Sequence, residues 1–145
     1  AVSSFAADFD VPFIVNDFLD IAMLVDADGL HTGQDDLPVS DLISLWGRHK
    51  LYGRTTHSLA QGELAKSQGV DYVSVGPIWE TPSKPGREGI GFDYLEAVKS
   101  LDIAYVAIGG IDDSNVSDIM AYSPFMIGVI RSFKSISDWQ ARFFS

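Results

Sequence analysis

Short apolar runs recur along the chain, and most of them are rich in β-branched and aromatic residues at successive positions. A run without polar alternation is typical of a strand that is buried on both faces of a parallel sheet. We therefore expect six strands, at Val11–Val15, Gly29–Thr32, Lys50–Thr55, Tyr72–Ile78, Ile103–Ile108 and Phe125–Ile130.

Amphipathic segments lie between these runs, and their polar residues indicate where helices begin. Ser58, followed three positions later by Gln61, has the pattern of a capping box, so a helix is expected through Lys66. Asp113 or Ser114 can cap another helix. Further helices are expected at Ser40–Trp46, Phe92–Ser100 and Ser137–Phe144, and Ala1–Asp8 has the pattern of the end of one.

The alternation of strands and helices predicts an α/β domain with a parallel sheet and right-handed crossovers. No linker or change in composition divides the chain, so residues 1–145 are expected to form one domain. The periodicity leaves open whether the sheet closes into a barrel or stays open. The polar motifs follow the carboxyl ends of the strands, where both architectures place their active sites.

Composition narrows the classes of function. A hydrophobic fraction of 46% excludes a disordered chain, and a net charge of −10 argues against nucleic acid as a partner. The absence of cysteine excludes thiol catalysis and cysteine-based zinc sites. No apolar run approaches the ~20 residues of a membrane span, and the N-terminus lacks the basic region of a signal peptide. We expect a protein of the cytoplasm or an organelle stroma without a membrane partner.

Acidic residues follow two neighbouring strands. Asn16 and Asp17 come directly after the first strand, and Asp35 and Asp36 follow the second. Carboxylates from adjacent strand ends can share a Mg²⁺ ion, which takes a few carboxylates together with substrate phosphate oxygens. The alternative is that these side chains cap a helix or stabilise a turn, which is the commoner use of aspartate.

Two other loops have side chains suited to phosphate. Thr81, Ser83 and Lys84 lie in a long polar loop after the fourth strand and offer two hydroxyls and an ammonium group, unless Lys84 is simply solvated. Gly109-Gly110 follows the fifth strand and Arg131 the sixth. Because loops after the last two strands of a barrel commonly form a phosphate site, this pair predicts phosphate binding.

Two histidines are candidates for proton transfer. His57 ends the third strand and could act as an acid or base, but no partner carboxylate lies nearby in the sequence, so a structural role is favoured. His31 lies within a strand and is expected to be a hydrogen-bonded histidine of the sheet interior.

Six segments, in the same order along the chain, resemble the thiamine phosphate synthase family. They cover nearly the whole chain and are Phe13–Asp17, Ala27–Leu37, Gly53–Ser58, Asp71–Pro77, Glu80–Pro85 and Val106–Ile111. The resemblance implies a TIM-type (β/α) barrel and a Mg²⁺-dependent transferase of thiamine biosynthesis. Such an enzyme joins an aminopyrimidine-methyl diphosphate to a thiazole phosphate and releases diphosphate.

The resemblance also assigns site residues. Asp17 and Asp36 would bind Mg²⁺, Asn16 would contact the diphosphate, and Thr55 stands where the family usually has serine. Thr81 and Lys84 would act on the diphosphate during catalysis, with Ser83 close by. The thiazole phosphate would be bound by Gly110, Ile130 and Arg131.

The chain departs from the family pattern in three places. Phe18 stands where arginine is usual, and Arg131 where many members have serine. The cationic motif of the family's second strand has no counterpart before Asn16, so six of the eight β/α units are expected here. The first two units are truncated, form a separate segment, or are replaced by a second copy in a homo-oligomer, and the sequence leaves these explanations open.

Two alternative functions remain. A thiazole tautomerase-like enzyme would use His57 for proton transfer and would not need the metal pair. A non-catalytic remnant would bind thiazole phosphate or thiamine phosphate through Gly109-Gly110 without turnover.

Overall fold

The computed structural model describes residues 2–82, 86 and 88–143. Its strands form one parallel sheet in chain order from β1 to β6. The strands are β1 (Ile14–Asn16), β2 (Gly29–Thr32), β3 (Leu51–Thr56), β4 (Tyr72–Val75), β5 (Ala104–Ile108) and β6 (Met126–Gly128).

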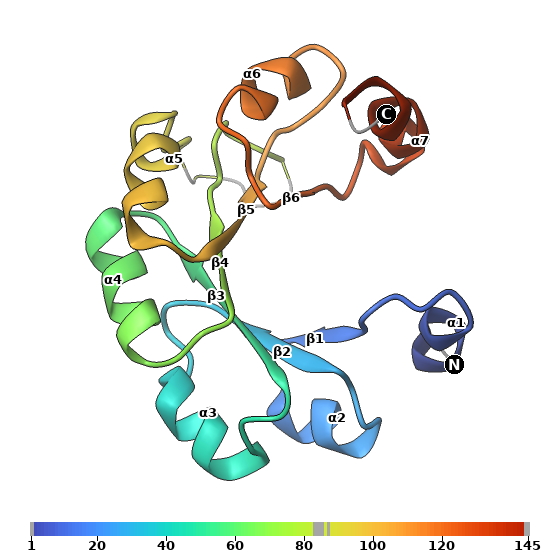
Figure 1. The fold of residues 1–145 in the computed structure, drawn as a ribbon, viewed down its shortest axis with the longest axis vertical. Coiled ribbons are helices and arrows are strands. Elements are labelled where there is room, and N and C mark those ends of the chain that lie inside the picture. The colour runs from blue at the N-terminus through green and yellow to red at the C-terminus, as the bar shows by residue number, and fades with distance from the viewer. Residues whose placement is uncertain (1, 83–85, 87, 144–145) are drawn as a thin grey trace.

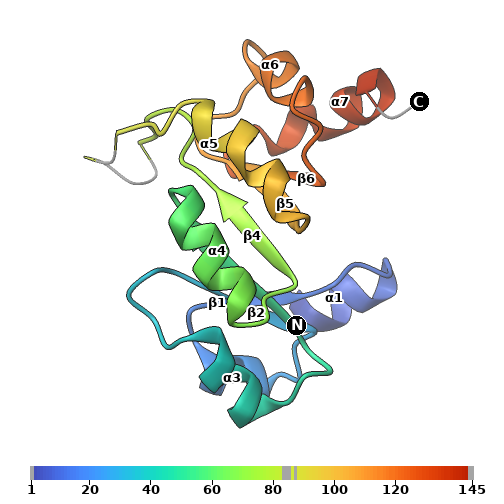
Figure 2. The ribbon, with the colours of Figure 1, turned by 60° about the vertical axis from the view of Figure 1, so that its left-hand side comes forward.

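A helix follows each strand, and the sheet curls so that these helices lie on its outer side (Figure 1). The α-helices are α1 (Val2–Asp8), α2 (Leu19–Leu24), α3 (Val39–Trp46), α4 (Leu59–Ser67), α5 (Asp93–Ala97), α6 (Val116–Met120) and α7 (Ile136–Phe143). Short 3₁₀ helices, η1 (Val98–Leu101) and η2 (Phe133–Ser135), extend α5 and precede α7. Figure 2 shows α4 and α5 packed along the outer side of β4 and β5.

The predicted α/β fold with parallel strands is confirmed, and the sheet is a curled half-barrel. Within the described part of the chain, β1 and β6 are the two edges of this sheet and do not pair with each other. The sheet does not close into a barrel over these residues, and the predicted six of eight units of a TIM-type barrel stay a prediction.

The hydrophobic core lies between the sheet and the outer helices. Tyr52, Val73 and Leu95 are completely buried there. The central strands β2, β3 and β4 are mostly buried, as their apolar runs predict. In β1 and β6 no residue is fully buried, because each of these strands has a neighbour on one side only and faces the open hollow of the sheet.

The first residues of α4 and α6 show whether the caps predicted from the sequence are used. Ser58 does cap α4, since its hydroxyl accepts a hydrogen bond from the Gln61 amide, while the Gln61 side chain accepts from the His57 amide. The prediction that Asp113 or Ser114 caps α6 is wrong, because α6 begins only after Asn115. The Ser114 hydroxyl instead donates to the Asp112 carboxylate, and the Asp113 carboxylate accepts from the Trp139 indole of α7.

Over the residues that the structure covers, no helix combines the length and apolar character needed to cross a membrane.

Candidate active site

A cavity of about 510 Å³ lies on the hollow face of the sheet, at the carboxyl ends of the strands. Segments far apart in the sequence meet there, because the parallel strands all end at this side. Its lining includes six of the predicted site residues: Asn16, Thr55, Thr81, Gly110, Ile130 and Arg131. Ser83 and Lys84 lie outside the described residues.

The loop after β5 is shaped by its two glycines. Gly109 and Gly110 have φ angles of +93° and +71°, in the left-handed region that glycine adopts without strain. A Cβ atom on Gly109 would lie 2.4 Å from the Cα of Pro77, and one on Gly110 would lie 2.7 Å from the Cβ of Trp79. Glycine is therefore required at both positions by close packing against the segment after β4.

Side chains from two later segments hold this loop in place. The amide of Asn115 donates to the Gly110 carbonyl at 2.9 Å, and its oxygen accepts from the Asp112 amide at the same distance. The Ser132 hydroxyl donates to the Ile111 carbonyl at 3.0 Å. Neither Asn115 nor Ser132 is among the residues predicted from the sequence, although an asparagine three residues after Asp112 is a local signal for a side-chain-stabilised turn.

Arg131 is exposed at the rim of the cavity, directly after Ile130. Hydrogen bonds from Ser114 hold the pKa of Asp112 below its ordinary value, and the charge of Arg131 lowers it further. Arg131 therefore adds positive charge near the Asp112 carboxylate, which follows the glycine loop in the chain.

A polar network forms the floor of the cavity. The His31 Nε2 atom lies 2.9 Å from the Thr55 hydroxyl, and Nδ1 lies 3.1 Å from the Tyr72 hydroxyl. Ser74 donates to Thr55 at 3.3 Å. Burial raises the pKa of Tyr72 to about 12, so its phenol stays protonated at neutral pH. His31 is thus hydrogen-bonded as expected, and Thr55 reaches the cavity with a hydroxyl that is already engaged.

His57 also lines the cavity. Its Nδ1 atom lies 2.5 Å from the Gly76 carbonyl, and because a carbonyl only accepts, Nδ1 carries the proton. Its backbone amide donates to Gln61. These contacts agree with the structural role that the sequence favoured.

The acidic pair lies at neighbouring strand ends. The Asp17 amide donates to the His31 carbonyl at 2.8 Å across the β1–β2 pair, and Asp17 adopts a left-handed φ of +68°. Asp36 Oδ2 accepts from the Gly33 amide at 2.6 Å, so Asp36 does stabilise the turn after β2. This contact leaves the other carboxylate oxygen for a further ligand.

The candidate donors for Mg²⁺ are the carboxylates of Asp17 and Asp36. In the described ranges no three His, Cys, Asp or Glu side chains are grouped so that they could hold a metal ion. Two carboxylates suit Mg²⁺ when the substrate supplies phosphate oxygens, because this ion is commonly bound by one or two carboxylates, substrate phosphates and water. Asp17 and Asp36 would be the two carboxylates at these strand ends available to an ion that arrives with a diphosphate, although neither is among the residues that line the cavity.

Comparison with known proteins gives consistent results. The sequence model of the family described as "Thiamine monophosphate synthase" matches residues 1–133. The chain is 42% identical over 130 residues to the thiamine-phosphate synthase of Thermosynechococcus vestitus, a match that covers 89% of this chain and 37% of that protein. It is 42% identical over 134 residues to that of Pelotomaculum thermopropionicum, covering 91% of this chain and 62% of the relative.

A solved structure is similar over almost the whole chain. Thiamine phosphate pyrophosphorylase from Pyrococcus furiosus superposes with a TM-score of 0.84 at 25% identity. The match covers 98% of this chain and 71% of that protein. The chain thus spans less than two thirds of the two curated relatives and a larger share of this structure.

Proposed function

This chain belongs to the thiamine monophosphate synthase family, and from that premise we propose that it carries the substrate site of a thiamine phosphate synthase. The reaction joins an aminopyrimidine-methyl diphosphate to a thiazole phosphate and gives thiamine phosphate and diphosphate. The observation that carries the proposal is one cavity lined both by Asn16, the residue before Asp17, and by the Gly110–Arg131 side.

The thiazole phosphate is assigned to the β5–β6 side of the cavity. The glycine loop lets the backbone approach an anion closely, and Asn115 and Ser132 hold that loop in place before the ligand arrives. Arg131 supplies the positive charge at the rim, and Ile130 lies beside it.

The diphosphate is assigned to the β1–β2 side. Asp17 and Asp36 would hold Mg²⁺ against it, and Asn16 would donate to its oxygens. Thr81 lines the same cavity from the segment after β4. Ser83 and Lys84 follow Thr81 in the sequence, and we assign them to the diphosphate by the family resemblance alone.

The chemistry demands electrostatic stabilisation more than a strong base. The carbon–oxygen bond of the pyrimidine methylene breaks, diphosphate departs with the electron pair, and the thiazole nitrogen supplies a new pair to the methylene carbon. Bound Mg²⁺ supplies neutralisation of the diphosphate charge. The residues of this chain bind and orient the two substrates, and Lys84 adds positive charge at the leaving group.

For the whole fold, we propose that the curled sheet represents six of the eight units of a TIM-type barrel. The two uncovered edges, β1 and β6, would then each pair with one of the remaining two strands. These units would come from the same polypeptide, a separate segment or a second copy.

Two alternatives follow from specific observations. The glycine loop held by Asn115, beside Arg131 in the cavity lining, would by itself suit a protein that binds thiazole phosphate without turnover. The position of His57 in the cavity lining favours a tautomerase-like proton transfer.

The test is formation of thiamine phosphate from both substrates by the purified chain, with and without Mg²⁺. Mg²⁺-dependent product supports the proposal. Binding of thiazole phosphate with no release of diphosphate supports the remnant. Metal-independent isomerisation of the thiazole that is lost in His57→Gln would identify the tautomerase.

A further inference from the structure

Arg54 is a buried cation that is not among the residues predicted from the sequence. It lies on β3 with 7% of its surface exposed. One terminal nitrogen donates to the Thr32 hydroxyl at 3.0 Å and the Leu37 carbonyl at 2.8 Å. The other donates to the carbonyls of Gln34 and Asp36, at 3.1 Å and 3.2 Å.

These acceptors belong almost entirely to one loop. Three of the four are backbone carbonyls of the segment that joins β2 to α3, and Thr32 is the last residue of β2. A planar guanidinium with five donors can bind several carbonyls at once in fixed directions, which the single ammonium of lysine cannot reproduce. Arg54 therefore fixes the path of the loop after β2.

Burial of this charge is costly, and the structure offsets it in an unusual way. Among the described residues, no carboxylate forms an ion pair with Arg54. Burial lowers the pKa of Arg54, while the charges of Asp36 and Asp35 oppose that change. A buried arginine remains charged and keeps its place only where acceptors satisfy it, so this loop and Arg54 depend on each other.

The same loop presents Asp36. Its carboxylate accepts from the Gly33 amide at 2.6 Å, and its own backbone carbonyl is one of the three that Arg54 binds. A displaced loop would move this carboxylate from its present place after β2.

We propose that Arg54 is a positioning residue, which holds the β2–α3 loop so that Asp36 meets a Mg²⁺-diphosphate; this rests on the proposed function. Arg54 acts through the loop carbonyls and does not touch the ligand. Second-layer residues of this kind orient metal ligands and set metal affinity.

The test compares Arg54→Met and Arg54→Lys with Arg48→Met as the matched control. Arg48 precedes the same strand at its other end, is half exposed and pairs with Asp71. The probe is inorganic diphosphate with Mg²⁺, measured by calorimetry, together with amide hydrogen exchange of residues 33–37. Circular dichroism checks that each variant is folded.

We expect Arg54→Met to weaken Mg²⁺-diphosphate binding roughly 10-fold to 100-fold and to speed exchange at Gly33 and Asp36. Arg54→Lys should give an affinity and exchange rates between those of the unaltered chain and Arg54→Met. In both variants, binding of inorganic phosphate at the glycine loop should be unchanged. Arg48→Met should alter none of these. If Arg54→Met does not fold, Arg54→Lys must still show faster loop exchange.

Unchanged exchange of residues 33–37 in both Arg54 variants overturns the inference, as does an equal loss of affinity in Arg48→Met. Failure of the unaltered chain to bind Mg²⁺-diphosphate would instead contradict the proposed function. In that case the exchange data alone decide whether Arg54 holds the loop.

Discussion

Single residues around the cavity are held by hydrogen bonds within the protein before any ligand binds. Thr55 is bonded to His31, Asp36 to Gly33, and Asn115 to the glycine loop. Fixed groups of this kind stabilise charge without reorganising during the reaction. Loss of a supporting bond should therefore weaken ligand binding as well as folding.

Asn115 supports the glycine loop through its side chain. Asn115→Ala removes two hydrogen bonds from the glycine loop and should lower the free energy of unfolding by about 1–3 kcal/mol. It should also weaken thiazole phosphate binding. Urea unfolding and calorimetry measure the two effects. Ser117→Ala, an exposed change on the adjacent helix α6, is the control and should leave thiazole phosphate binding intact.

Tyr72 gives a prediction about pH. Its pKa rises from the ordinary value of 10.0 to about 12 through burial, so the folded protein keeps the phenol proton more tightly than the unfolded chain. Below pH 10 the Tyr72 phenol is neutral in both states and should not change the free energy of unfolding. As pH rises from 10 to about 12, the phenol ionises first in the unfolded chain, so the free energy of unfolding should fall. Tyr72→Phe should remove this part of the decline in pH-dependent urea unfolding. An equal decline in the variant would assign the effect to other groups.

At the scale of elements, the sequence predicted best where local signals and burial agree. The strand Gly29–Thr32 was predicted with its observed bounds, and the Ser58 cap begins α4 as expected. The outer strands β1 and β6 are shorter than their apolar runs, because a strand extends only as far as its backbone pairs with a neighbouring strand. That pairing cannot be read from the sequence. Asp113 is of a residue type that commonly caps helices, but its carboxylate instead accepts a hydrogen bond from Trp139 of α7.

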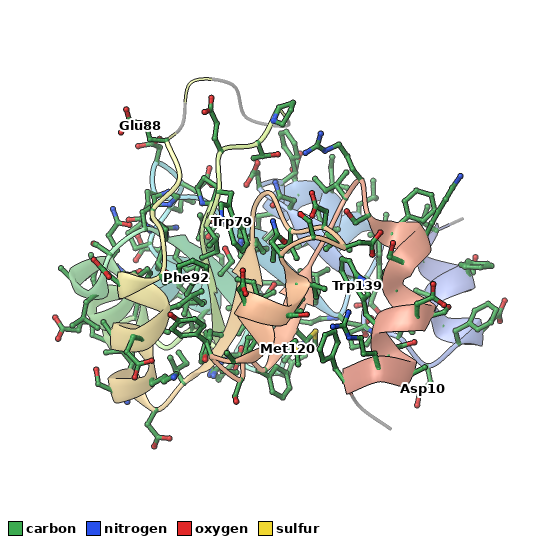
Figure 3. The ribbon with its side chains drawn as sticks, turned by 90° about the horizontal axis from the view of Figure 1, so that it is seen from above. Asp10, Trp79, Glu88, Phe92, Met120 and Trp139 are labelled. Atoms are coloured by element: carbon green, nitrogen blue, oxygen red, sulfur yellow. The ribbon has the colours of Figure 1, made fainter. Side chains whose placement is uncertain are left out.

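That contact ties α7 to the loop after β5. Asp113 accepts from the Trp139 indole at 2.7 Å and from the Ser135 hydroxyl at 3.0 Å. Trp139 lies on the side of α7 that faces the rest of the fold (Figure 3). Such a bond between residues 26 positions apart cannot be read from a single sequence.

Trp139→Phe keeps an aromatic ring but leaves the Asp113 carboxylate with one donor fewer. We expect a loss of about 1–3 kcal/mol in the free energy of unfolding, because a hydrogen bond to a charged group is lost. Limited proteolysis should then cut first within α7. Ser137→Ala, exposed on the same helix, should behave like the unaltered chain in both assays. Equal resistance of Trp139→Phe and Ser137→Ala to proteolysis would show that the Trp139–Asp113 hydrogen bond contributes little to holding α7.

At the scale of the whole molecule, the sequence predicted several strand ends that line the cavity but not the residues that support their loops. Asn16, Gly110 and Arg131 meet in one cavity because parallel strands end on the same side. Arg54 and Asn115 were missed because their roles depend on the paths of loops.

The two edges of the sheet carry exposed apolar side chains. Phe9, Val11 and Phe18 lie near β1, and Phe125 and Met126 near β6, each at least half exposed. Exposed apolar surface beside an unpaired strand promotes association.

The 145 residues alone should therefore associate as concentration rises, and Phe125→Lys should weaken this association in sedimentation experiments. Leu64→Lys places the same charge on α4, away from both edges, and serves as the control. Equal effects of the two variants would show that the β6 edge has no special part in association.

If one cavity holds two separate anion sites, each of two variants should lose the binding of one substrate and keep that of the other. Asp36→Asn removes a charge yet keeps an oxygen that can accept from Gly33, and Arg131→Met removes the cation at the other side. Asp36→Asn should weaken Mg²⁺-dependent binding of the diphosphate substrate roughly tenfold or more and spare thiazole phosphate, and Arg131→Met should do the reverse. Equal loss of both ligands in either variant would contradict the division of the cavity.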